Sequence, residues 1–169
     1  MDEPRHRSPR WAGLVGTAAS LAGLAVAGYL TYEHYTGSAN LVCSDKGVVN
    51  CLAVTTSVYS KVAGVPVAVL GLVFFAVMVA FQLPAAWRRT DPLIRRARMA
   101  WAVIGLGTVL YLLGTELFRI DAICLWCTAV HVLTFVVFVS TVLATLSTAG
   151  DPYDLGDAGD PDELYEPSP

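Results

Sequence analysis

Hydrophobic residues of this chain fall into four stretches that contain no Asp, Glu, Lys or Arg: residues 11–32, 62–87, 99–115 and 122–150. Roughly 20 helical residues cross a bilayer core of about 30 Å, so the first, second and fourth stretches are long enough to span a membrane. The third has 17 residues and is expected to extend to about residue 118, with Glu116 near the membrane interface. The pattern therefore predicts helices over about 11–34, 62–87, 99–118 and 122–148.

Composition agrees with a membrane setting. The 169 residues are 55% hydrophobic and 15% charged, and the mean hydropathy is +0.57. These values are too apolar for an ordinary soluble domain. We therefore predict an all-α membrane protein, a four-transmembrane-helix bundle (residues 11–148) with one long extracytoplasmic loop between its first and second helices. A lipid bilayer is the expected surrounding, and no nucleic-acid partner is expected.

The N-terminal region has some features of a signal peptide. Residues 1–10 are basic, an apolar run follows, and Ala25-Val26-Ala27 resembles a cleavage site. The uncharged run of 22 residues is longer than a usual signal core, so we expect a helix that stays as an anchor. Cleavage would leave the following loop on the same side of the membrane.

Arginine placement predicts the orientation. Arginines occupy the N-terminus (5, 7 and 10) and the segment between the second and third helices (88, 89, 95, 96 and 98), whereas the other two connections hold only Lys46, Lys61 and Arg119. The positive-inside rule then places both termini in the cytoplasm, as expected for a multi-pass protein of the plasma (inner) membrane. Residues 149–169 form an acidic, proline-containing tail that we expect to be disordered.

The same orientation places all four cysteines on the extracytoplasmic side, which is an oxidising compartment. Cys43 and Cys51 form a Cys-x7-Cys pattern in the first loop, and Cys124 and Cys127 form a Cys-x2-Cys pattern at the start of the fourth helix. Three interpretations compete: two structural disulfides, a zinc site with four thiolate ligands, and two dithiol pairs that exchange with each other. The third is favoured, because a Cys-x2-Cys disulfide closes too short a loop to stabilise much and oxidation competes with zinc.

Position along the fourth helix separates the roles of its two thiols. With Asp121 as N-cap, Cys124 becomes the third helical residue, where backbone N–H groups favour a thiolate; Arg119 would add to this effect and Asp121 would oppose it. Cys127 lies about 4.5 Å deeper at helical rise, within reach of a lipid-soluble oxidant. A quinone accepts the two electrons that a dithiol releases. The polar loop that carries Cys43 and Cys51 is expected to be mobile and accessible to a soluble dithiol.

The motif order resembles the vitamin K epoxide reductase (VKOR) family. It runs from Cys43-x7-Cys51 in the first outer loop through Ser57 and a second helix containing Gly64-x-Pro66 to the Cys124-x2-Cys127 motif. The other four-helix thiol oxidase type, the DsbB type, carries its Cys-x-x-Cys in the first outer loop, so the order here argues against it. The resemblance covers the four-helix core and implies the bacterial type without a fused thioredoxin-like domain.

The resemblance implies residue roles. Cys124 and Cys127 are the redox-active pair beside the quinone, and Cys127 reacts with it. Cys43 exchanges disulfides with a thioredoxin-fold partner, and Cys51 exchanges with Cys124. Ser57 is the family serine near the quinone, with a helix cap as its alternative role. Further residues implied or expected at the quinone are Tyr59, Leu112, Glu116 and His131.

Two positions depart from the mammalian pattern of the family. His131 stands where mammalian members have a tyrosine, and Val67 stands where they have an asparagine. The expected function is an oxidoreductase of the membrane: a thiol oxidase that passes electrons from a separate, DsbA-like protein to menaquinone or ubiquinone, without a metal. The alternative is a vitamin K quinone or epoxide reductase that acts on a small molecule, and a non-catalytic scaffold with two permanent disulfides is a third possibility.

Overall fold

The computed structural model describes residues 10–37, 43, 47–83, 86 and 91–149. The expectations for the basic N-terminus and the acidic tail lie outside these residues, except that Arg10 and Ala149 belong to helices. In chain order the elements are α1 (Arg10–Thr36), α2 (Cys51–Thr55), the 3-10 turn η1 (Val58–Ser60), β1 (Lys61–Val62), β2 (Val65–Pro66), α3 (Val67–Gln82), α5 (Pro92–Thr115), the π-helical turn η2 (Glu116–Ile120) and α6 (Leu125–Ala149).

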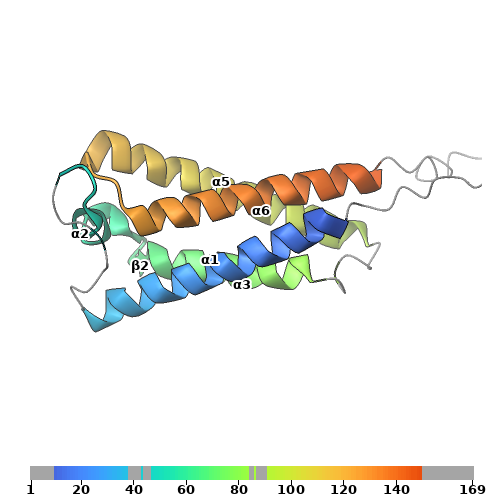
Figure 1. Cartoon of the computed structure of the whole chain (residues 1–169), viewed down its shortest axis with the longest axis horizontal. Helices are drawn as coiled ribbons and strands as arrows, with labels where there is room; N and C mark the ends of the chain where they lie inside the picture. The colour runs from blue at the N-terminus through green and yellow to red at the C-terminus, as the bar shows by residue number, and fades with distance from the viewer. Residues whose placement is uncertain (1–9, 38–42, 44–46, 84–85, 87–90, 150–169) are drawn as a thin grey trace, which may run out of the picture.

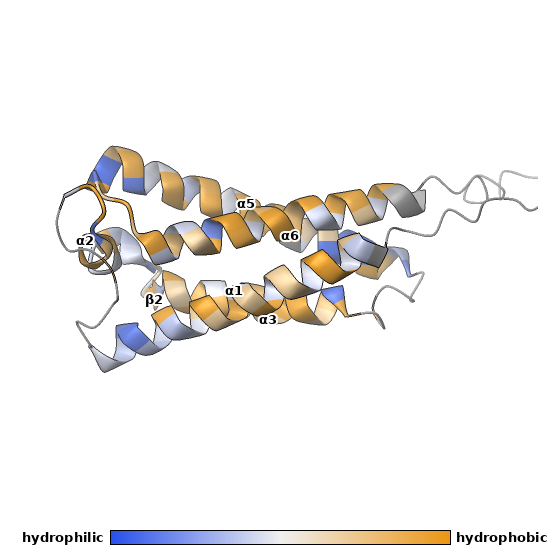
Figure 2. Ribbon diagram, viewed as in Figure 1, coloured by the Kyte–Doolittle hydropathy of each residue, from blue (hydrophilic) through white to orange (hydrophobic). Residues whose placement is uncertain are grey.

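The four long helices lie side by side and alternate in direction (Figure 1). Helix α1 begins, and α6 ends, at one end of the bundle, where α3 also ends and α5 begins. At the opposite end lie α2, η2 and the start of α6. Hydrophilic residues gather near the two ends, and hydrophobic residues cover the lengths between them (Figure 2). The prediction of a helical membrane protein therefore agrees with the architecture.

Three helices of the described part of the chain are long and apolar enough to cross a membrane: Trp11–Thr36, Pro92–Ile120 and Leu125–Leu146. The second predicted span, residues 62–87, is shorter than expected. Helix α3 has 16 residues, about 24 Å at helical rise, which is less than a bilayer core of about 30 Å. The architecture thus supports three spans by length and leaves the fourth as a shorter apolar helix.

Local backbone geometry explains why α3 is short. Ala63 and Gly64 both have positive φ, 51° and 84°, and join β1 to β2 in an antiparallel two-residue hairpin. The predicted Gly64-x-Pro66 segment is therefore a hairpin and not part of the helix. At the other end, Leu83 is extended (ψ 143°), as expected for a residue before proline.

Helix α5 begins seven residues earlier than predicted. Asp91 is its N-cap and accepts a hydrogen bond from the Leu93 N–H at 2.8 Å, and Pro92 occupies the first helical position, which proline favours. Arg95, Arg96 and Arg98 therefore belong to a helix and not to a loop. Arg98 is buried, and its Nη2 donates to the Ala86 carbonyl at 3.2 Å.

Small residues allow the helices to approach closely. A Cβ at Gly23 of α1 would overlap the ring of Phe75 of α3, and one at Gly105 of α5 would overlap the ring of Phe74. Near the end where α1 begins, α3 joins its neighbours through polar groups: Gln82 Nε2 donates to Thr141 Oγ1 at 2.9 Å, and Thr17 Oγ1 donates to the Gln82 carbonyl at 3.0 Å. These contacts hold α1, α3 and α6 together.

Candidate functional site

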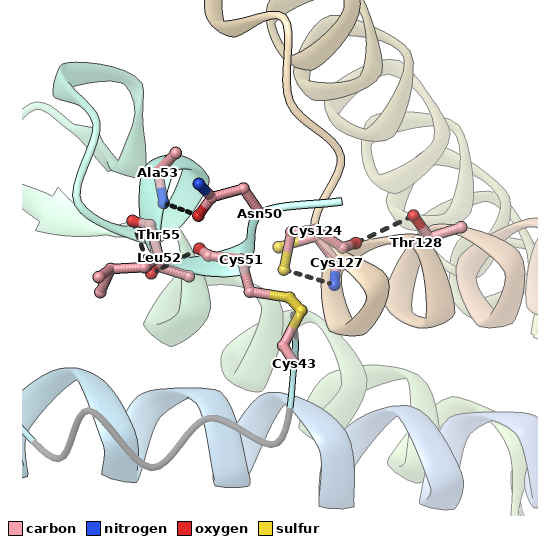
Figure 3. The surroundings of a disulfide bond; sticks show 9 residues. All are labelled: Cys43, Asn50, Cys51, Leu52, Ala53, Thr55, Cys124, Cys127 and Thr128. Carbon is pink, nitrogen blue, oxygen red and sulfur yellow. Dashed lines mark hydrogen bonds between the residues drawn. A yellow bond between two sulfur atoms is a disulfide. The ribbon is translucent and has the colours of Figure 1, made fainter. Parts of the chain in front are cut away.

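All four cysteines lie at the end of the bundle that carries α2. Cys43 and Cys51 form a disulfide, whereas Cys124 and Cys127 are free thiols. Figure 3 shows the Cys124 and Cys127 side chains next to this disulfide. Cys51 and Cys124 belong to one buried apolar cluster, against which Cys43 and Cys127 also pack. The two dithiol pairs suggested by sequence are therefore neighbours in space.

Backbone hydrogen bonds hold the loop against the start of α6. The Ile123 N–H donates to the Val48 carbonyl at 2.8 Å, and the Asn50 N–H donates to the Ile123 carbonyl at 3.1 Å, which forms a parallel bridge between Val49 and Ile123. The loop was expected to be mobile. Residues 44–46 lie outside the described part, but residues 48–50 are paired with Ile123, directly before Cys124.

The short helix α2 positions Cys51. Asn50 is its N-cap, and Asn50 Oδ1 accepts the Ala53 N–H at 2.9 Å, which satisfies a backbone donor that the helix itself leaves unpaired. Cys51 is the first residue of α2 and is 1% exposed. The cap and the bridge to Ile123 together fix Cys51 beside Cys124.

The start of α6 differs from the prediction. Asp121 is not the N-cap: it has a left-handed backbone (φ 52°) at the end of η2, and α6 begins at Leu125. Cys124 is thus the residue before the helix and not its third residue. Its sulfur accepts the Cys127 N–H at 3.3 Å, and its carbonyl accepts the Thr128 N–H at 2.9 Å. Cys124 therefore takes the capping position that Asp121 was expected to fill.

This arrangement activates the Cys124 thiol. The Cys127 thiol donates to the Cys124 sulfur and holds the pKa of Cys124 below its ordinary value of 9.0, although burial opposes this effect. The N–H of Cys127 also lowers the pKa of Cys124, while the negative charge of Glu116 raises it. Since the thiolate is the attacking form, Cys124 is prepared for exchange with the adjacent disulfide. Arg119, which sequence suggested as an additional positive charge here, has an exposed side chain.

A cavity of about 810 Å³ lies between the helices, next to the cluster that contains the cysteines. Of the four cysteines, Cys127 is the one that lines it. The residues that sequence suggested for a quinone site also line it: Ser57, Tyr59, Leu112, Glu116 and His131. Its volume lies within the usual range for small-molecule pockets, and its lining is mostly apolar, so the cavity fits a quinone ring with an apolar chain.

Two residues that line this cavity have buried polar atoms with unused hydrogen-bonding capacity. Glu116 is 3% exposed and His131 is 8% exposed, and among the described residues Glu116 Oε2 and His131 Nδ1 have no hydrogen-bond partner. Buried polar atoms normally have partners, so both atoms are suited to bind a ligand's oxygen or hydroxyl. Ser57 has a partner: its Oγ donates to the Val54 carbonyl at 2.8 Å. Ser57 occupies the N-cap position of η1 but makes no side-chain cap bond there.

Sequence reasoning missed several cavity residues. From α1, Leu30, Glu33 and His34 contribute to the lining, as do Thr108 of α5 and Thr134 of α6. Helical spacing holds a signal for the last two: Thr134 follows His131 by three residues, and Thr108 precedes Leu112 by four, and such residues share a helix face. The α1 residues carry no such signal, because which face of α1 turns toward the cavity depends on its packing against α3 and α6.

The described residues contain no group of three or more His, Cys, Asp or Glu side chains placed to hold a metal ion. Two of the four cysteines are already joined in a disulfide, and a disulfide sulfur is not a thiolate ligand. The geometry thus gives one oxidised pair, one reduced pair and a cavity that reaches the reduced pair. Such an arrangement can move two electrons between the pairs by thiol–disulfide exchange.

Comparison with known proteins gives one finding. The model of the vitamin K epoxide reductase family matches residues 14–142, most of the chain, and a search of curated proteins found no match. The matched span contains both cysteine pairs and the cavity residues described above. The chain therefore belongs to the vitamin K epoxide reductase family, and is a membrane redox enzyme of the thiol/quinone oxidoreductase kind.

Proposed function

We propose that this protein is a membrane thiol oxidase that supports disulfide bond formation in exported proteins. A reduced thioredoxin-fold, DsbA-like partner delivers two electrons to the Cys43–Cys51 disulfide, and exchange between Cys51 and Cys124 passes them to the Cys124–Cys127 pair. That pair then reduces menaquinone or ubiquinone in the cavity. The observation that carries this proposal is the position of Cys127, which contacts the cysteine cluster on one side and lines the cavity on the other.

Each protein step is a thiolate attack through a mixed disulfide. Cys43 receives the attack of the partner's thiolate, and Cys51 leaves as a thiolate. Reoxidation of the first pair requires Cys51 to attack the Cys124–Cys127 disulfide at Cys124, which releases Cys127. Cys43 then attacks Cys51 in the mixed disulfide, which reforms the Cys43–Cys51 bond and releases Cys124. The packing of Cys51 and Cys124 in one cluster supports this assignment, because exchange requires two sulfurs in contact.

A quinone in the cavity supplies a two-electron acceptor. Ser57, Tyr59, Leu112, Glu116 and His131 are the side chains that we propose to bind it. Access from the bilayer is supported by Leu70 and Val73 of α3 and Ile104 of α5, which line the cavity and are also exposed on the outside of the bundle. Large exposed apolar side chains at a cavity mouth suit a ligand that arrives through lipid.

The membrane arrangement is part of the proposal. We infer that α3 crosses the bilayer with the other three long helices, and that the cysteine end faces the extracytoplasmic compartment, with both termini in the cytoplasm. The antiparallel order of α1, α3, α5 and α6 supports this topology, as does the bias of arginine toward the other end.

Cysteine variants in lipid vesicles test the electron path. We expect Cys124→Ala and Cys127→Ala to abolish quinone reduction with any reductant. Cys43→Ala and Cys51→Ala should still reduce quinone when a small dithiol is the reductant, but not when the reduced protein partner is. Cys51→Ala should also trap the oxidised form of that partner, because the Cys43 thiolate attacks the partner's disulfide, forms a mixed disulfide and releases one of the partner's thiols. A Cys43→Ala protein that oxidises the partner at the wild-type rate contradicts the proposed path.

Reduction of vitamin K epoxide without oxidation of any protein partner would replace the proposal with the small-molecule alternative.

A further inference from the structure

Oxidation of the Cys124–Cys127 pair requires movement of protons as well as electrons. Two thiols lose two electrons and two protons as the sulfur–sulfur bond forms, and a quinone that accepts two electrons and two protons becomes a quinol. The reaction therefore balances without an outside proton donor. Cys124 is buried and does not line the cavity, whereas Cys127 does, so the Cys124 proton needs a neighbouring group to carry it to the cavity.

Glu116 lies at this junction. The backbone N–H of Cys124 stabilises its carboxylate, and the charge of Glu116 acts on both the Cys124 and Cys127 thiols. The same side chain lines the cavity, and its Oε2 has no partner in the described part of the chain. One side chain thus lies beside the Cys124 backbone, lines the cavity and has an oxygen without a partner in the described part of the chain.

The local backbone accounts for this placement. Glu116 is the first residue of the π-helical turn η2, which ends α5. The wider spacing of a π turn is common at functional sites, and here it is followed by the left-handed Asp121, which turns the chain toward Cys124. A carboxylate this deeply buried, with no ion pair to any residue that the structure describes, is costly unless it has a role.

Other ionisable groups of the cavity are less well placed. Lys61 is exposed, and Glu33 and His34 are half-buried at the end of α1. His131 is four residues beyond Cys127, about 6 Å along α6, and lies farther from Cys124, which precedes the helix. The ionisable side chains that line the cavity, apart from Glu116, are Glu33, His34, Tyr59, Lys61, Cys127 and His131. Of these residues, only Cys127 has a hydrogen bond to Cys124: its backbone N–H donates to the Cys124 sulfur.

We propose that the Glu116 carboxyl carries protons from the Cys124–Cys127 dithiol to the quinone oxygens. This inference rests on the proposed function. Glu116 accepts the proton of one thiol, gives it to a quinone oxygen, and repeats the transfer for the second proton, so that it ends in its starting state. The electrons pass from sulfur to quinone, and Glu116 itself is neither oxidised nor reduced.

Glu116→Gln tests this role. Glutamine keeps the size of the side chain and an acceptor for the Cys124 N–H, but cannot carry a proton. With a small dithiol as reductant, we expect the maximal rate of quinone reduction to fall about a hundredfold, in the range typical of lost general acid–base catalysis, while the KM for quinone changes by less than about twofold. Glu116→Asp should retain part of the activity. Asp121→Asn is the matched control, since it removes an exposed carboxylate close in sequence at a left-handed position that asparagine tolerates, and it should behave as wild type.

Infrared difference spectra provide a readout independent of turnover. Spectra of the wild-type protein, recorded during a single round of quinone reduction by the Cys124–Cys127 dithiol, should contain a transient protonated-carboxyl band that is absent from Glu116→Gln and present in Asp121→Asn. A wild-type spectrum without this band overturns the inference, as does a Glu116→Gln protein with an unchanged maximal rate or with a changed KM alone. A wild-type protein that reduces no quinone overturns the proposed function itself, so the two failures are distinguishable.

Discussion

Cys124 combines two features that a buried thiol rarely has together. It is fully buried, which disfavours a thiolate, yet its sulfur receives hydrogen bonds from the thiol and the backbone N–H of Cys127. The first effect alone would make Cys124 an inert structural residue. The hydrogen bonds reverse the direction of the pKa shift, so the reactivity of Cys124 depends on its neighbour three residues later.

Removal of the Cys127 thiol should therefore raise the pKa of Cys124. In a background that lacks Cys43 and Cys51, Cys124 is the only titrating thiol of a Cys127→Ala variant, and the thiolate can be followed by its ultraviolet absorbance. As pH falls, the alanine variant should lose its thiolate at a higher pH than a Cys127→Ser variant, because serine keeps a hydroxyl donor. Equal titration of the two variants would contradict the assigned hydrogen bond.

At the scale of elements, α2 is too short to be stable alone. Isolated helices need about 12–15 residues even in favourable sequences, and α2 has five. Its stability therefore depends on the Asn50 cap and on the backbone bridge to Ile123. Because Cys51 is the first residue of α2, anything that loosens this element moves Cys51 away from Cys124.

Asn50→Ala should slow transfer between the cysteine pairs. Loss of an N-cap costs about 1 kcal/mol, equivalent to about a fivefold change in an equilibrium constant. We expect electron transfer from the protein partner to slow by up to about that factor, whereas quinone reduction driven by a small dithiol stays unchanged. Rapid-mixing measurements with both reductants distinguish the two routes. Asn50→Asp, which keeps the acceptor, is the control. Equal slowing in both variants would show that the N-cap hydrogen bond does not determine the rate of transfer.

The sequence predicted helices better than their boundaries. Charge-free runs locate α1, α3, α5 and α6, because burial in lipid excludes charge from any helix. Boundaries depend on single residues instead: the Ala63–Gly64 turn shortens α3, and the Asp91 cap lengthens α5 past three arginines. The start of α6 was also wrong, because the π turn η2 carries Asp121 into a left-handed conformation, which no periodic pattern of hydrophobicity indicates.

At the scale of the whole molecule, the cysteines and the arginine-bearing start of α5 lie at opposite ends of the bundle. The cysteine cluster lies at one end of the bundle and the first turns of α5, with Arg95 and Arg96, at the other. The proposed thiol oxidase needs this separation, because its protein substrate would be exported while the arginine-rich segments would stay in the cytoplasm. In this proposal the quinone in the cavity takes the electrons from the cysteines, so that the electrons need not cross the bilayer.

Labelling in intact cells tests this orientation. In a Cys51→Ala variant, Cys43 has lost its disulfide partner, and we expect a membrane-impermeant maleimide to label it without permeabilisation. The matched probe is Leu93→Cys in a chain without the four native cysteines, since Leu93 is 70% exposed at the start of α5. It should be labelled only after the cells are permeabilised, because the arginine-bearing end is held in the cytoplasm. The reverse pattern, with Leu93→Cys labelled in intact cells and Cys43 protected, would place the dithiol pairs in a reducing compartment. An oxidase for exported proteins could not work in that orientation.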